Sequence, residues 1–181
     1  MVKRENKTSV VEGENKMSQI KIEKVVLSIG GTADILEKGQ KLLAKITGGK
    51  PIKKSSTKRI PSLNVRPGLD VGCMITLRGK KAEDTLKRLL GALDFKLKRR
   101  QFSENSFSFG IKEYIEIPEM EYIRDVGIIG LDVSVAFVKP GKRVIRKKIK
   151  QGKLPKKQNI SAEEIIEFMQ KKFNIKLKEK L

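Results

Sequence analysis

Apolar residues recur at every second position in three segments of the chain, 71–78, 107–117 and 131–138. A fourth segment, 20–29, is rich in β-branched residues. Both patterns are typical of β-strands, whose side chains point alternately to opposite faces. In the segment 107–117 the apolar face would hold Phe107, Phe109, Ile111, Ile115 and Ile117. Each strand would therefore have one face that packs on helices and one face open to a partner.

Helical spacing of apolar residues appears in three other segments. Thr32 or Asp34 could cap the first helix. Its apolar face would consist of Ile35, Leu36, Leu42, Leu43 and Ile46. A second helix would start near Ala82, and Ser161 with Glu164 forms a capping box for a third. The order of strands and helices predicts an α+β fold, a two-layer sandwich in which a mostly antiparallel sheet has helices packed on one face.

The remaining segments suggest a tail, one domain and two basic additions to it. Residues 1–16 have no apolar period, and we predict that they form a disordered N-terminal tail. Residues 17–181 would form a single domain. Within it, residues 52–69 hold two prolines and no helical period, which indicates a long loop. Residues 139–160 are basic and broken by glycine and proline, which predicts a C-terminal extension without a buried helical face.

The charge of the chain narrows the choice of partner. Lys and Arg number 41 against 21 Asp and Glu, which gives a formal net charge of +20 and a pI near 10.1. Self-repulsion of this size destabilises a compact state unless a polyanion neutralises it. Nucleic acid is the usual polyanion for such a chain. A membrane surface is disfavoured, because aromatic residues make up only 5% and Trp is absent.

Two long stretches concentrate the positive charge. Residues 38–69 hold nine Lys or Arg and residues 139–157 hold ten, and neither stretch contains an acidic residue. A single basic run is usually a solvated surface. Two acid-free runs favour contacts with phosphates, each of which adds affinity through counterion release. From these runs we predict RNA-binding side chains at Lys50, Lys142, Arg143, Arg146, Lys147 and Lys148.

Small polar and basic residues would share the open face of the sheet. They are Lys24, Ser28, Thr76, Arg78 and Ser134. Such side chains suit a sugar–phosphate backbone, including the 2′-hydroxyl groups of RNA. The face lacks exposed aromatic pairs on which bases could stack, which favours recognition by shape. An ordinary solvated sheet face is the alternative.

The sequence lacks the usual residues of an active site. It contains no histidine and one cysteine, which removes the commonest general base and metal ligand and excludes an intrachain disulfide. Cys73 lies in an apolar strand and is predicted to be a core residue rather than a nucleophile. The residues at 48–50, GGK, lack the spacing of a phosphate-binding loop. We therefore expect no catalytic residue, no metal and no cofactor.

The N-terminal residues do not resemble a targeting signal. The first sixteen residues are polar, include Glu5, Glu12 and Glu14, and lack the apolar stretch of a signal peptide. No apolar run reaches the roughly 18 residues that a membrane-spanning helix needs. We expect a cytoplasmic protein.

One segment reverses the sign of the charge. Between positions 113 and 125 the chain holds five acidic residues against one basic residue, Arg124. The acidic residues are Glu113, Glu116, Glu119, Glu121 and Asp125. On a chain this basic, such a patch does not favour RNA as its partner. It either offsets nearby cations or docks a basic protein.

Several motifs resemble those of one ribosomal protein family. They are IKIEKVVLSIG at 20–30, LLAKITGGKP at 42–51, GCMITLRG at 72–79, FSFGIKE at 107–113 and GLDVSVAFVKPGKRV at 130–144. In order and spacing they resemble the universal large-subunit ribosomal protein five family, numbered eleven in eukaryotes. The basic C-terminal part resembles the archaeal members most. The resemblance runs from about position 17 to the last residue.

The resemblance implies a structural, non-enzymatic role in the large ribosomal subunit. Members of the family bind 5S rRNA in the central protuberance, beside large-subunit rRNA and neighbouring proteins, and reach P-site tRNA with a basic loop. By position this loop is about 55–65, and its charges are Lys53, Lys54, Lys58, Arg59 and Arg66. The family also forms a bridge to small-subunit protein thirteen, a basic protein. The acidic segment lies at the bridge position, 113–131.

The chain departs from the family pattern in two places. GGTA at 30–33 stands where the family often has G-V-G-E, and Tyr114 stands where His is common. Two other functions remain open. A free RNA chaperone or non-specific nucleic-acid-binding protein would use the same charge without a fixed site, which leaves the acidic patch without a purpose. An enzyme acting on RNA through carboxylates is disfavoured by the missing histidine.

Overall fold

The computed structural model describes residues 15–178, so most of the predicted tail, residues 1–14, lies outside the described residues. Six strands form one sheet in the order β2-β3-β1-β7-β6-β5, and every neighbouring pair is antiparallel. Their bounds are Lys21–Gly30 for β1, Ile52–Ser55 for β2, Asp70–Leu77 for β3, Phe102–Ser103 for β5, Ser106–Ile111 for β6 and Leu131–Val138 for β7. A separate parallel pair joins β4 (Lys96–Lys98) to β8 (Lys176–Lys178).

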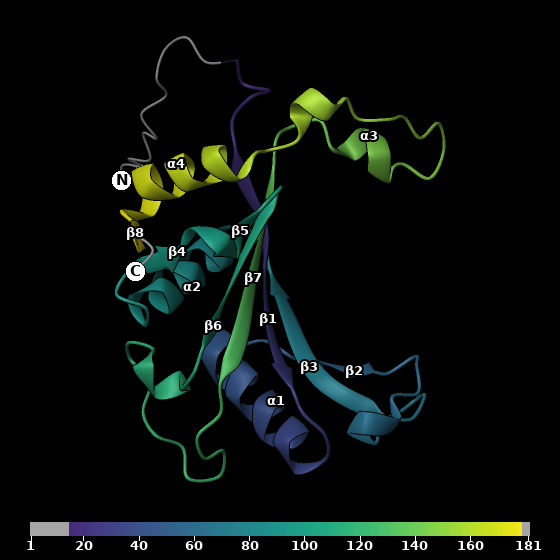
Figure 1. Ribbon diagram of the computed structural model, residues 1–181, viewed down its shortest axis with the longest axis vertical. Coiled ribbons are helices and arrows are strands. Elements are labelled where there is room, and N and C mark those ends of the chain that lie inside the picture. The colour runs from purple at the N-terminus through teal and green to yellow at the C-terminus, as the bar shows by residue number, and fades with distance from the viewer. Residues whose placement is uncertain (1–14, 179–181) are drawn as a thin grey trace, which may run out of the picture.

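Three helices cover one face of the large sheet and leave the other face open (Figure 1). They are α1 (Asp34–Thr47), α2 (Lys80–Gly91) and α4 (Ala162–Phe173). A single-turn helix, α3 (Arg143–Arg146), lies on the opposite side of the sheet. The predicted two-layer α+β sandwich, with a mostly antiparallel sheet and its helices packed on one face, is confirmed.

Alternation along the strands builds the core between the two layers. The predicted inward residues of β7 are all buried, and they join the helix residues in one apolar cluster. Within this cluster the ring of Phe107 stacks at centroid distances of 5.2–5.8 Å on the rings of Phe102, Phe109 and Phe137. Each such contact is worth about 0.5–1.5 kcal/mol beyond area burial. The stack ties β5, β6 and β7 together and so fixes the open face behind them.

The start of α1 differs from the prediction. Neither Thr32 nor Asp34 caps the helix with its side chain, because the N-cap residue is Ala33, at φ 47°, and no side-chain cap bond forms. Gly31 permits this turn, since a Cβ at that position would lie 2.4 Å from the Ile35 side chain. The helix therefore begins at a strained turn rather than at a polar cap.

The segment 52–69, predicted as a long loop, is partly ordered as a hairpin. β2 pairs with β3, and the chain then turns through a short 3-10 helix, η1 (Pro61–Leu63). A bridge between Ile60 and Val65 closes the turn, and Val65 is buried. All four residues of β2 are exposed. The segment therefore lacks the alternation that would have predicted a strand.

The segment 107–117, predicted as one strand, also ends early. β6 stops at Ile111, and a 3-10 turn, η3 (Tyr114–Glu116), follows. This turn reverses the expected sides, because Tyr114 is fully buried and Ile115 is exposed. The hydroxyl oxygen of Tyr114 accepts a hydrogen bond of 2.9 Å from the N–H of Ile123. Tyr114 thus anchors the acidic segment that follows β6.

Candidate nucleic-acid interface

The strand register brings the predicted polar residues to the open face. Val26 on β1 pairs with Thr76 on one side and with Ser134 on the other. Ser134 pairs in turn with Ser108 of β6, which extends this row across the sheet. Residues opposite each other in a sheet point to the same face, so three hydroxyl groups lie in one row. These hydroxyl groups can donate to or accept from a sugar–phosphate backbone.

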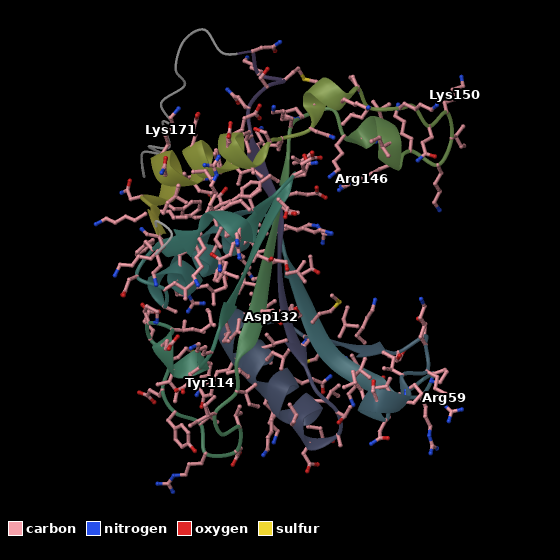
Figure 2. All side chains as sticks on the ribbon, viewed as in Figure 1. Arg59, Tyr114, Asp132, Arg146, Lys150 and Lys171 are labelled. Atoms are coloured by element: carbon pink, nitrogen blue, oxygen red, sulfur yellow. The ribbon has the colours of Figure 1, made fainter. Side chains whose placement is uncertain are left out.

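The other predicted residues lie on either side of this row. Ser28 pairs with Asp132, an exposed acid that the sequence analysis did not single out. Lys24 pairs with Ala136, and Arg78 follows directly after β3, whose last residue pairs with the neighbour of Lys24. The face is therefore polar, with positive charge toward one end and a single carboxylate near the other (Figure 2).

Two basic segments project beyond the open face on the side away from the helices (Figure 1). We call residues 139–160, which include α3, the upper arm, and residues 52–69, which include β2 and η1, the lower arm. Arg59 lies at the end of the lower arm, and Lys150 lies at the end of the upper arm (Figure 2). The two acid-free runs of the sequence thus flank one polar sheet face, which gives the chain a basic concave side.

A carboxylate ties the upper arm to the sheet. Glu23, at an irregularity in the pairing of β1, accepts a hydrogen bond of 3.1 Å from Nζ of Lys142 and also pairs with Arg146. Only 10% of the Glu23 side chain is exposed. A carboxylate this buried needs such partners, because removing a charge from water is costly. Sequence reasoning missed Glu23, although it is the only acidic residue of β1.

The remaining cations of the upper arm are oriented toward solvent. Arg143, Lys147 and Lys148 are exposed, and no carboxylate of the described chain lies within salt-bridge distance of them. At the base of the arm, Nζ of Lys139 pairs with Glu164 at 2.7 Å. Glu164 also donates its backbone N–H to the hydroxyl of Ser161 at 3.3 Å, the N-cap bond predicted for α4. The arm therefore stands on two ion pairs and presents further cations.

The lower arm directs its cations to different sides. Lys54 pairs with Gly72 of β3 and shares the open face, whereas Lys53 pairs with the buried Cys73 and so points to the helix side. Lys58 and Arg59 are exposed in the turn beyond β2. Lys50 and Arg66 are also exposed. The register thus separates two neighbouring lysines that the sequence could not tell apart.

The acidic segment lies away from both arms, at the end of β6 and on the helix side (Figure 1). All five of its predicted acidic residues are exposed. Three large apolar side chains are exposed among them, Ile115, Tyr122 and Ile128, and the last is 66% exposed. One acid, Glu119, lies 3.7 Å from Arg88 of α2. Apolar side chains surrounded by charge are typical of a protein interface rather than of an RNA surface.

The described part of the chain offers no centre for catalysis. Within residues 15–178, no group of three or more His, Cys, Asp or Glu residues could hold a metal ion. Cys73 is buried in β3, and desolvation by burial raises the pKa of its thiol, which disfavours the nucleophilic thiolate. No helix in the same residues has the length and apolar content to cross a membrane.

Comparison with known proteins agrees with this basic, non-catalytic surface. Residues 70–173 match the model for the C-terminus of the ribosomal protein uL5 family. The large ribosomal subunit protein uL5 of Nanoarchaeum equitans is 42% identical over 167 residues, which cover 91% of this chain and 99% of the relative. Those of Sulfurisphaera tokodaii and Methanobrevibacter smithii are 39% and 38% identical, over 91% and 89% of this chain and 96% of each relative.

Proposed function

The chain belongs to the archaeal branch of the ribosomal protein uL5 family, a structural and non-enzymatic component of the large ribosomal subunit, and we propose that it binds 5S rRNA and helps attach it in the central protuberance. The observation that carries this proposal is the polar sheet face flanked by two acid-free basic arms. Large-subunit rRNA and neighbouring central-protuberance proteins would contact the remaining surface.

The geometry supports binding to a folded RNA by its shape. The hydroxyl row formed by Thr76, Ser134 and Ser108 suits ribose 2′-hydroxyl groups, which a double-stranded RNA displays in its shallow minor groove. The cations of the arms would contact phosphates on either side of that groove. Phosphate contacts position the RNA without reading its bases.

Binding to 5S rRNA should exceed binding to an unrelated structured RNA of equal length by at least about tenfold, since only a matching shape engages both arms and the face. Filter-binding titrations of both RNAs at physiological salt would measure this ratio. Raising the salt should weaken both complexes, because phosphate contacts release counterions. Equal affinity for the two RNAs would instead support a free chaperone or non-specific binder.

We propose further that the lower arm contacts P-site tRNA. Its turn holds Lys58 and Arg59, which are exposed and lie far along the arm from the sheet face (Figure 2). The buried Val65 and the bridge from Ile60 give the turn a defined shape. A shaped, basic projection beyond the 5S-binding face can reach a second RNA.

Replacing Lys58 and Arg59 with alanine should leave 5S affinity within about threefold, while tRNA dissociates from the P site about tenfold faster, as two phosphate contacts are lost. Subunits reconstituted with the variant and filter retention of labelled tRNA would measure this. Lys41→Ala and Lys45→Ala on the outer side of α1 provide a variant of equal charge change. A collapse of 5S binding would show that the turn has been assigned to the wrong RNA.

The acidic segment is proposed to form the bridge to the small subunit, through basic small-subunit protein thirteen. Its exposed Tyr122 and Ile128 would supply apolar contacts, and its five acidic residues would surround them. Charged groups at the rim of an interface mainly guide encounter and orientation. The anchoring hydrogen bond of Tyr114 gives this surface a fixed base.

A further inference from the structure

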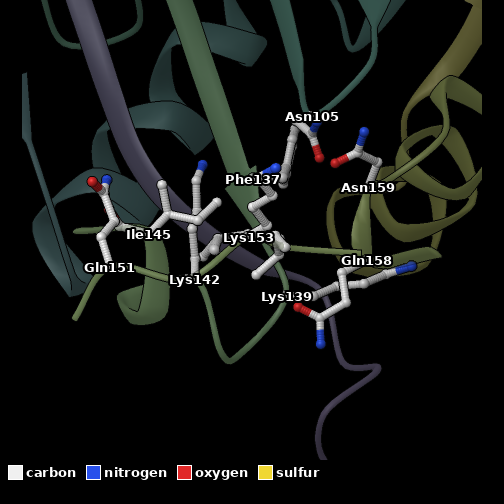
Figure 3. Close-up of a pocket in the computed structure, with 12 residues that line it drawn as sticks. Asn105, Phe137, Lys139, Lys142, Ile145, Gln151, Lys153, Gln158 and Asn159 are labelled. Atoms are coloured by element: carbon white, nitrogen blue, oxygen red, sulfur yellow. The ribbon is translucent and has the colours of Figure 1, made fainter. Parts of the chain in front are cut away.

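A pocket of about 650 Å³ opens between the end of β7, the upper arm and a short 3-10 helix, η4 (Lys156–Gln158) (Figure 3). This volume falls within the range of pockets that hold small organic molecules. Its apolar lining includes Val138, Ile145 and Leu154. The pocket lies within the arm that the proposed function assigns to RNA, but none of the phosphate contacts proposed above uses it.

Uncharged amides supply much of the polar lining. Asn105, Gln151, Gln158 and Asn159 all border the pocket. The side-chain oxygen of Asn105 accepts a 2.9 Å hydrogen bond from the N–H of Ile160, so its amide nitrogen is the group that it can offer to a ligand. The amide nitrogen of Gln151 donates to the carbonyl of Ile145. These bonds hold both amides in place before any ligand binds.

Gln158 carries an unmet hydrogen-bonding requirement. Its side-chain oxygen Oε1 is buried, and no donor in the described residues lies within hydrogen-bond distance of it. Leaving a buried acceptor unpaired costs about 1–3 kcal/mol, and such groups are rare in folded proteins. A ligand with an N–H group would supply the missing bond.

Cations border the same pocket, but two of them already have partners. Lys139 pairs with Glu164 and Lys142 with Glu23, whereas Lys153 is exposed. The two ion pairs fix opposite sides of the pocket to α4 and β1. The interior is therefore preformed and largely neutral, while positive charge remains at its border. That combination suits a ligand with a neutral body and an attached phosphate.

We propose that this pocket holds one unpaired nucleobase of the bound RNA, turned out of its stack. A base combines apolar faces, which suit Val138 and Leu154, with N–H donors, which suit Oε1 of Gln158. Its backbone phosphate would lie near Lys153. RNA-binding proteins commonly recognise unstacked bases through their hydrogen-bonding edges. The proposal rests on the proposed function and adds base recognition to a surface that otherwise recognises shape.

Chemical probing of 5S rRNA bound to the full-length protein tests this inference. Dimethyl sulfate modifies unpaired adenine and cytosine, and a carbodiimide modifies unpaired guanine and uracil. Wild-type protein should reduce the reactivity of one unpaired base at least about fivefold. Gln158→Leu should restore that reactivity and weaken binding about threefold to tenfold, the effect of one hydrogen bond. It should not lower the melting temperature, because it removes a buried acceptor that has no partner.

Gln40→Leu, at a half-buried glutamine of α1, is the matched control and should leave the protected base unreactive. If 5S rRNA binds but no base differs in reactivity between wild-type protein and Gln158→Leu, the pocket does not hold a base and the proposed function stands. A drop in melting temperature with unchanged probing would assign Gln158 a purely structural role and overturn the inference. Absence of 5S binding by wild-type protein would overturn the proposed function and this inference together.

Discussion

Replacing Arg143, Lys147 and Lys148 with glutamine should weaken binding of the protein to 5S rRNA about 100-fold at physiological salt. All three side chains are exposed, and within the described residues none is neutralised by a carboxylate. A phosphate contact contributes about 1 kcal/mol at this salt through counterion release, so three lost contacts account for the change. The slope of log affinity against log salt should become shallower by about 2.7. Filter binding at several salt concentrations measures both quantities.

A second triple variant separates local contacts from overall charge. Lys38, Lys41 and Lys45 are exposed on the outer side of α1, away from the open face, and their replacement by glutamine removes the same three charges. This variant should bind 5S rRNA within about threefold of wild type, because only long-range attraction is lost and salt screens it over about 8 Å. Equal losses in the two triple variants would mean that the chain binds RNA by net charge alone, as a non-specific binder does.

Reversing Glu119 and Glu121 to lysine should slow the joining of large to small subunits about tenfold or more at low salt. The substitutions remove two attractive charges and place two cations before a basic partner, and like charges across an interface cost several times more than an exposed pair contributes. The effect should shrink as salt is raised. Light scattering of mixed subunits at two salt concentrations would follow the reaction.

The fold and 5S binding should survive this reversal. Glu119 loses its exposed pair with Arg88, which contributes at most about 1 kcal/mol, and Arg88 still donates to the carbonyl of Ile46 at 2.9 Å. Glu104→Lys with Glu167→Lys, at two exposed acids outside the segment, gives a control of equal charge change. Unchanged joining of the Glu119/Glu121 variant at low salt would mean that the acidic segment only balances charge within the molecule.

The parts of the fold that the sequence predicts are those with a clear buried pattern. β7 was predicted with its observed bounds, since its residues alternate strictly between buried and exposed or half-buried positions. The N-cap of α4 at Ser161 was predicted because a hydroxyl three residues before a glutamate has a recognisable spacing. β2 was missed because both of its sides are exposed at the edge of the sheet. The turn after β6 was missed because Tyr114, not Ile115, enters the core.

The candidate site divides along the same line. Charge runs are visible in the sequence, so both arms were predicted as basic segments. Their position relative to the sheet depends on pairings between distant segments, which no local pattern encodes. Glu23 lies 119 residues from Lys142 and 123 from Arg146. Lys53 and Lys54 are adjacent in sequence, yet their register with β3 directs them to opposite faces.

Glu23 gives the upper arm an internal counter-ion, and this changes how the charge of the chain translates into binding. Lys142 and Arg146 already have a carboxylate beside them, so their charge displaces fewer of the mobile cations condensed on RNA than the charge of Lys147 or Lys148 does. A phosphate that approaches the first two residues must share them with Glu23. The salt dependence of RNA binding is therefore set by the cations that lack an acid partner, and the formal charge of +20 overstates the number of ions released.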